Sequence, residues 1–226
     1  MNDLDKQFFE SAVARDVKTM RAALEAGANV DVVNGDRRTA LMRVSKRGYE
    51  EVVEVLFEYN ARVNLLDKNN KTALMGASKN NHYNIVELLL KHDAVVNQSD
   101  YRGRTALMRA AFLGHLHVVE LLVENGADIN IADEKGRTAL MDSVIAFKVD
   151  VIKYLLTQGA QINAQDYNGV TSLMRASFGG YPELVQLLLD AGADKRIVDH
   201  ENQLAIHYVR TNNFEVLKPL LKVEEQ

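Results

Sequence analysis

The sequence predicts an all-α protein, a solenoid of stacked helix-turn-helix units with protruding β-hairpin-like loops. Two observations support this prediction. The tetrapeptide TALM begins at Thr39, Thr72, Thr105 and Thr138, and TSLM begins at Thr171, each 33 residues after the one before. The same order of apolar runs, glycines and polar loops returns between these threonines. A fixed period of roughly 20 to 50 residues is typical of repeat architectures, in which units stack because none buries its apolar face alone.

One unit illustrates the expected elements in order. In the third copy, Thr105 precedes an apolar-periodic run and is placed to cap a first helix, which Gly114 ends. A second helix follows through residues 116–125, with apolar residues at helical spacing, and Gly126 ends it. Residues 127–137 are polar, contain a glycine and form the loop that leads to the next threonine.

The period divides the chain into expected segments of one repeat domain, 1–226. Residues 1–33 are expected to form an N-terminal cap with helices near 4–14 and 17–26, and residues 199–226 a C-terminal cap. The repeats between them are 34–66, 67–99, 100–132, 133–165 and 166–198. Phe147 replaces the glycine that ends a first helix, which predicts the least regular turn, and Pro219 predicts that the last helix starts late, kinks or frays.

The period, the two helices per unit and TALM in the place of T-P-L-H resemble the ankyrin repeat, over nearly the whole chain. Methionine stands where the family has histidine in all five clear copies, and the histidine remains only at His207. The histidine-based bracing between neighbouring loops of that family is therefore not assured. The methionines recur beside a buried leucine and are expected to pack in the core. They are Met42, Met75, Met108, Met141 and Met174.

Composition and motifs argue against an enzyme, a cofactor and a metal site. The 226 residues are 47% hydrophobic and 26% charged, and the absence of cysteine removes thiolate ligands, disulfides and cysteine nucleophiles. The six histidines have no metal-ligand spacing, and no nucleophile elbow, phosphate loop or dinucleotide fingerprint occurs. No signal-like segment or run of about 18 apolar residues is present, so we expect an intracellular, cytoplasmic protein.

Positions that differ between copies identify the expected binding face, because repeated positions build the stack. These positions lie one to four residues before each threonine and four, seven and eight after it; we call them the variable face. The resemblance to ankyrins implies that they line the concave face used for partners. Over six units they carry 14 basic and 4 acidic residues, a net +10 against −4 for the chain, and the positive charge is strongest in the first three.

The variable face also carries large apolar residues. Tyr101 and Tyr167 share one loop place, Phe112 and Phe178 share one helix place, and Ile145 lies between the phenylalanines. Arginine beside exposed aromatic residues is typical of interface hot spots. The alternative is that these side chains close gaps between loops and helices. The predicted partner-binding residues are Arg37, Arg38, Arg43, Lys46, Lys71, Lys79, Tyr101, Arg102, Arg104, Arg109, Phe112, Arg137, Ile145, Tyr167, Arg175 and Phe178.

These observations predict a non-catalytic protein–protein interaction module that binds an acidic protein surface or peptide, is monomeric by itself and has no membrane partner. The alternative is that the same arginines bind a short oligonucleotide or a phosphorylated ligand. An overall pI near 5.9 disfavours long nucleic acids. A scaffold or spacer without a dedicated partner is the remaining non-catalytic possibility.

Overall fold

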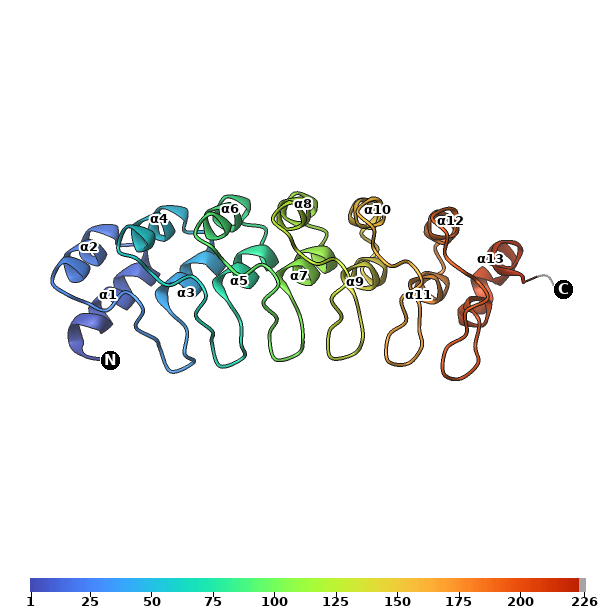
Figure 1. The fold of residues 1–226 in the computed structure, drawn as a ribbon, viewed down its shortest axis with the longest axis horizontal. Coiled ribbons are helices and arrows are strands. Elements are labelled where there is room, and N and C mark those ends of the chain that lie inside the picture. The colour runs from blue at the N-terminus through green and yellow to red at the C-terminus, as the bar shows by residue number, and fades with distance from the viewer. Residues whose placement is uncertain (224–226) are drawn as a thin grey trace. The chain divides into compact units, whose positions relative to one another are not determined.

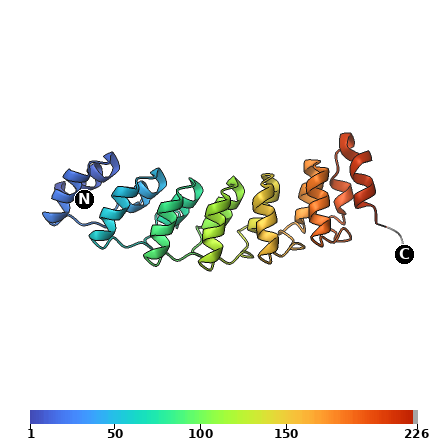
Figure 2. The ribbon, with the colours of Figure 1, turned by 90° about the horizontal axis from the view of Figure 1, so that it is seen from above.

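The structure is a computed structural model that describes residues 1–223, so residues 224–226 of the expected C-terminal cap lie outside the described residues. The predicted all-α class is confirmed: residues 1–223 form thirteen α-helices and two short 3₁₀ helices, with one isolated β-bridge between Val33 and Thr39 and no strand (Figure 1). The helices occur in successive pairs, and a loop projects from one side of each pair (Figures 1 and 2).

The helix pairs follow the 33-residue period. In order, they are α1 (Asp3–Ala14) with α2 (Val17–Glu25), α3 (Ala40–Arg47) with α4 (Glu50–Glu58), α5 (Ala73–Lys79) with α6 (Tyr83–Lys91), α7 (Ala106–Leu113) with α8 (Leu116–Glu124), α9 (Ala139–Ile145) with α10 (Val149–Thr157), and α11 (Ser172–Gly179) with α12 (Pro182–Asp190). The last copy has the 3₁₀ helices η1 (Ala205–Tyr208) and η2 (Thr211–Asn213) followed by α13 (Phe214–Leu221). The chain forms two compact units: unit 1 comprises residues 1–110 and 117–127, and unit 2 residues 111–116 and 128–226.

Threonine caps begin the first helices, as predicted. Each side-chain oxygen accepts a hydrogen bond from the backbone N–H three residues on, at 3.2 to 3.4 Å. The five threonines are buried together with the methionine two residues past the start of each helix. The methionines are 0 to 8% exposed, so the expected core packing is confirmed. In the fifth copy the Met174 sulfur also accepts the Thr171 N–H at 3.4 Å, a weak second half of the cap.

The turn at Phe147 is more regular than predicted. Phe147 has φ +53°, the left-handed conformation that Gly114 (φ +81°) and Gly180 (φ +71°) adopt at the same place in sister copies. Its backbone N–H donates to Val144 O at 3.1 Å, as that of Gly114 donates to Ala111 O. The bulky residue therefore keeps the turn and accepts backbone strain, while its ring packs on Tyr181 at 4.2 Å between centroids.

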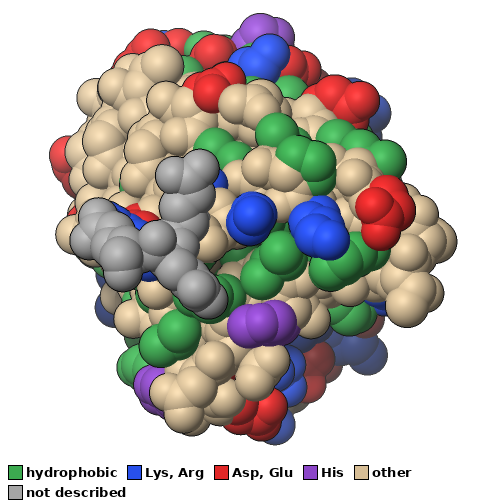
Figure 3. Space-filling model, turned by 90° about the vertical axis from the view of Figure 1, so that its right-hand side faces the viewer, with side chains coloured by type: hydrophobic (Ala, Val, Ile, Leu, Met, Phe, Trp, Pro, Cys, Tyr) green, Lys and Arg blue, Asp and Glu red, His purple; other side chains and the backbone are tan. Residues whose placement is uncertain are grey.

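The last helix does not start late. It begins at Phe214, directly after η2, and continues through Pro219 to Leu221. The irregularity lies instead in the first helix of that copy, which is reduced to η1. Figure 3 looks onto this end of unit 2, where hydrophobic and basic side chains lie side by side. A terminal copy that faces water on one side is expected to be degenerate in this way.

Candidate interaction surface

A buried aspartate organises the tip of five projecting loops, and Asn34 takes its place in the first loop. The carboxylate Oδ1 of each aspartate accepts backbone N–H groups two and four residues on, at 2.8 to 3.0 Å. The aspartates are Asp67, Asp100, Asp133, Asp166 and Asp199. Their own N–H groups close a hairpin-like turn onto the carbonyl four residues on, at 2.9 to 3.1 Å. Aspartate favours such turns because its short side chain mimics a backbone acceptor.

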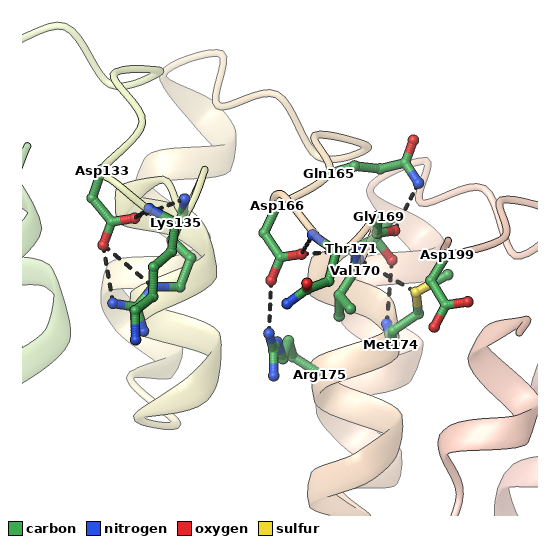
Figure 4. Close-up of polar contacts among 12 residues, drawn as sticks. Asp133, Lys135, Gln165, Asp166, Gly169, Val170, Thr171, Met174, Arg175 and Asp199 are labelled. Atoms are coloured by element: carbon green, nitrogen blue, oxygen red, sulfur yellow. Dashed lines mark hydrogen bonds and ion pairs between the residues drawn. The ribbon is translucent and has the colours of Figure 1, made fainter. Parts of the chain in front are cut away.

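The second carboxylate oxygen holds an arginine in four of these loops. Asp67 pairs with Arg38 at 3.1 Å and Asp133 with Arg137 at 3.0 Å. Asp100 pairs with Arg109, whose side chain is only 12% exposed. Asp166 pairs with Arg175 at 2.7 Å, as Figure 4 shows together with the backbone bonds around Asp133 and Asp166. In the last copy Tyr208 donates its hydroxyl to Asp199 instead. Four of the predicted partner-binding arginines thus serve the loops themselves.

These contacts set the charge states of the loop groups. Burial opposes ionisation of the Asp67 and Asp133 carboxyls, but the backbone N–H donors and the paired arginines outweigh it and lower both pKa values below the ordinary range for aspartate. Burial and the hydrogen bond to Asp199 raise the pKa of Tyr208 to about 12. The Asp67 and Asp133 carboxyls are therefore ionised at neutral pH. Including all five aspartates reduces the net charge of the variable face from +10 to +5.

Basic side chains are concentrated in unit 1. A cavity of about 370 Å³ opens between α3 and α5, lined by seven basic side chains and one acidic side chain, Asp67. We call it the basic cavity. Its basic residues are Arg38, Arg43, Lys46, Arg47, Lys71, Lys79 and Arg109. Six of these seven belong to the predicted partner-binding set, and the seventh, Arg47, occupies a variable-face position eight residues after Thr39.

The floor of the basic cavity includes Gly76. This glycine lies four residues after its threonine, where sister copies carry Arg43, Arg109 and Arg175. Gly76 therefore leaves open a position that arginine fills in three other repeats. Sequence reasoning selected the surrounding cations but missed this glycine, although the departure from the sister copies was visible in the sequence.

The predicted apolar residues are exposed, and most of them lie in unit 2. Phe112, Ile145 and Phe178 are 41%, 42% and 50% exposed and share one register on α7, α9 and α11. Arg210 lies over the Phe178 ring at 4.2 Å. Tyr167 is 68% exposed, yet its ring lies against Gly136 in the preceding loop, so this tyrosine also closes a gap as the alternative interpretation held.

The other predicted residues lie at the loop tips of unit 1. Tyr101 is 54% exposed, with the Arg102 guanidinium 5.3 Å from its ring centre. Arg37 is exposed and has φ +58°, a left-handed position that Gly103 occupies in the third copy's loop. Arg104 is half-buried, and its backbone N–H donates to Asp100. The predicted set therefore divides between the basic cavity and loop tips of unit 1, the apolar row of unit 2, and Arg137, Tyr167 and Arg175, which contact the loops of unit 2.

Backbone hydrogen bonds connect neighbouring loops where the family histidines are missing. Within unit 1 the Lys68 N–H donates to Asp36 O at 3.1 Å, and the Tyr101 N–H donates to Asn69 O at 3.2 Å. Within unit 2 the Tyr167 N–H donates to Lys135 O at 3.0 Å, and a similar bond joins the next pair of loops. The loops are thus held in register without the histidine side chains.

Residues 1–223 contain no group of three or more His, Asp and Glu side chains that could hold a metal ion. None of the helices in this part of the chain is long and apolar enough to cross a membrane.

The fold and this surface define an α-helical repeat protein with aspartate-organised loops and side chains that vary from copy to copy. The family model "Ankyrin repeats (3 copies)" matches residues 9–100, 60–133, 96–166, 130–199 and 146–226. The chain therefore belongs to the ankyrin repeat family, which confirms the predicted solenoid class. Ankyrin repeat domains serve in general as protein–protein interaction modules.

Solved structures of ankyrin repeat domains are similar over almost their full length. The human ASB11 ankyrin repeat domain superposes with a TM-score of 0.84 at 22% identity, covering 96% of this chain and 99% of that one. The ankyrin repeat domain of Bcl-3, a member of the IκB protein family, has a TM-score of 0.82 at 27% identity, covering 94% and 97%. A search of curated proteins gave no match.

Proposed function

We propose that this chain is a non-catalytic interaction module that binds an acidic protein surface or peptide through its variable face. The basic cavity is the observation that carries the proposal: seven cations and one carboxylate line it. That carboxylate, Asp67, already accepts two backbone N–H groups and the Arg38 guanidinium. Like charges held this close favour an anionic partner that neutralises them.

The apolar row of unit 2 supplies the second part of the proposed interface. Phe112, Ile145 and Phe178 expose 41 to 50% of their surface at one helix register. Rigid aromatic side chains contribute buried area at low entropy cost when a partner covers them, whereas exposed cations contribute mainly to the rate of encounter. We therefore propose that the cations of unit 1 speed the encounter with the partner and that the apolar residues of unit 2 provide the buried contact area that anchors it.

Affinity capture from the source cells tests this assignment. The double variant Arg43→Glu, Lys79→Glu changes two cavity cations, and we expect it to lose the partners that the unchanged protein retains. Lys18→Glu, which alters an exposed lysine on α2 outside the cavity, is the matched control and should retain them. Identical capture by the double variant and the unchanged protein would contradict the basic face. Arg109 is unsuitable for this test because it is buried against Asp100.

The anchoring role has its own variant. Phe112→Ala with Phe178→Ala leaves the cavity intact, and we expect it to weaken retention of the same partners without changing the melting temperature by more than a few degrees. We further propose that the chain acts as a single copy. Light scattering during gel filtration should then give a mass near 25.3 kDa, and a mass twice as large would contradict this part of the proposal.

A further inference from the structure

The basic cavity is a hollow between two packed helices and not only a charged surface patch. Its lining comes from corresponding positions of two packed helices: Arg43, Lys46 and Arg47 on α3, and Gly76 and Lys79 on α5. Lys71 and Arg109 contribute from the flanking loop and helix. At about 370 Å³ it lies at the lower end of the range for ligand pockets.

The charge of this pocket exceeds what one carboxylate neutralises. Basic side chains outnumber acidic ones in the lining by seven to one, and the partner of Arg109, Asp100, is not among the lining residues. Burial and then the charge of Arg109 lower the pKa of Lys71, so the lysine already responds to its cationic neighbours. A phosphate monoester carries about −1.5 to −2 charge at neutral pH and three strong acceptor oxygens, against one charge for glutamate.

The lining residues also argue against other phosphate-bearing macromolecules. The residues that line the basic cavity include no aromatic side chain on which a base could stack. Its apolar side chains, Met42 and Met75, are 8% and 2% exposed, so neither can insert into a membrane. A cluster of arginine and lysine side chains is instead typical of phosphorylated side-chain recognition.

Building on the proposed function, we propose that the basic cavity at Gly76 is a phosphate-binding site that recognises one phosphorylated serine or threonine side chain of the partner protein. Arg43 is the forked donor for the phosphate oxygens, and Lys46, Lys71 and Lys79 supply point charges. Arg47 adds charge only, because its guanidinium already donates to Val13 O at 2.9 Å. Gly76 is the residue that makes room, because an arginine at this place would occupy the hollow.

The first test uses inorganic phosphate as the probe. In amide NMR spectra at low ionic strength, phosphate should shift the signals of Gly76, Lys79 and Asn80 in a saturable manner, and chloride at equal ionic strength should not. Arg43→Gln with Lys46→Gln should weaken phosphate binding at least about tenfold. Lys18→Gln with Lys153→Gln removes two exposed cations outside the variable face and the cavity and should leave binding unchanged. Absence of saturable shifts would overturn the proposal.

The second test separates shape from charge. Gly76→Arg adds a positive charge yet fills the cavity, as arginine fills this position in sister copies. Its Cβ would lie 3.3 Å from the Lys46 Cβ, a contact that a small movement relieves. We expect the variant to keep its fold by circular dichroism and to lose phosphate binding. If folded Gly76→Arg binds phosphate as tightly as the unchanged protein or more tightly, the cavity is not the site. If Gly76→Arg does not fold, the phosphate affinity of the Arg43→Gln, Lys46→Gln variant tests the proposal instead.

The third test identifies the source of the phosphate. Three otherwise identical short peptides carry phosphoserine, glutamate or serine at the centre, and a short single-stranded oligonucleotide serves as the fourth probe. The phosphoserine peptide should bind at least about tenfold more tightly than the glutamate peptide, and binding should require an open cavity at Gly76. Equal binding of these two peptides would overturn the phosphate inference while supporting an acidic partner. An oligonucleotide that binds more tightly than the phosphopeptide would overturn the choice of a phosphoprotein.

Discussion

The helix position four residues after the capping threonine is occupied differently in the two units. In α11 of unit 2, Arg175 occupies the place four residues after the threonine and pairs with Asp166 at 2.7 Å. In α5 of unit 1, Gly76 occupies that place and a cavity lined by cations opens. The flanking caps are the same in both helices, since Thr72 and Thr171 each accept the N–H three residues on. The scaffold thus tolerates either a filled or an empty position, and this choice distinguishes a closed surface from a pocket.

The largest effect is expected from removing a loop aspartate. Asp100→Ala removes the carboxylate that accepts two backbone N–H groups and leaves Arg109, 12% exposed, as a buried cation without its partner. We expect a loss of about 3–5 kcal/mol in the free energy of unfolding by urea denaturation. Asp166→Ala breaks the same contacts, but Arg175 is 34% exposed and regains water, so about 2 kcal/mol is expected. Equal losses of unfolding free energy in the two variants would show that burial of the paired arginine does not determine the size of the loss.

Lowering the pH should remove part of the stabilisation that the loop aspartates provide. The pKa values of Asp67 and Asp133 are lowered in the folded state, so their contribution is complete above the unfolded value of about 3.9 and is lost as pH falls through the folded value. The free energy of unfolding should therefore decrease below about pH 4. Asp133→Asn should show a smaller decrease over that range than the unchanged protein, and an identical pH dependence would contradict the assignment.

Replacing Arg175 by glycine should lower the free energy of unfolding less than Asp100→Ala does. Arg175→Gly removes the ion pair with Asp166 and places a glycine inside α11, and we expect a loss of about 2 kcal/mol. We expect no phosphate site to form there, because the corresponding neighbour on α9 is Asp142, whereas α3 presents Arg43 to the cavity of unit 1. Phosphate titration of Arg175→Gly checks this expectation, and saturable binding in unit 2 would weaken the role assigned to the α3 cations.

The smallest effect concerns the loop tips. The tips of unit 2 at Gly136 and Gly169 have φ +75° and +79°, whereas the first tip of unit 1 holds Arg37 at φ +58°. Glycine adopts this conformation without the strain of a side chain, so Arg37→Gly should raise the free energy of unfolding by about 1 kcal/mol. Gly169→Ala is the opposite test and should destabilise, because its Cβ would lie 2.8 Å from backbone atoms of the next loop.

The repeated residues predicted the fold well because each acts locally. Thr105, Gly114 and Gly126 specify a cap and two helix ends within a few residues, and the structure places all three as expected. The candidate surface was predicted less completely. The pairing of Arg109 with Asp100 joins residues nine apart, and counting charge only at variable positions excluded the repeated aspartates that neutralise half of it.

Counting charges at the variable positions also could not predict the basic cavity, for a different reason. Its lining joins residues of α3 and α5 that lie 33 residues apart in the sequence, such as Lys46 and Lys79. Their types were readable, but a hollow exists only where a side chain is missing between them, as at Gly76. The predicted late start of the last helix did not occur, since α13 begins at Phe214 and includes Pro219, and the first helix of that copy is the 3₁₀ helix η1.

Asparagines outside the variable face also join neighbouring copies. The Asn64 amide donates to Asp93 O at 2.9 Å and its oxygen accepts the Val95 N–H at 2.9 Å, across 29 and 31 residues of sequence. Asn163 repeats both bonds with Gly192 and Asp194. Coupling of this kind passes only from one copy to the next, so cooperativity in unfolding should decay along the chain as in a one-dimensional lattice. A chain shortened by its terminal copy would then lose one coupling term and keep the others.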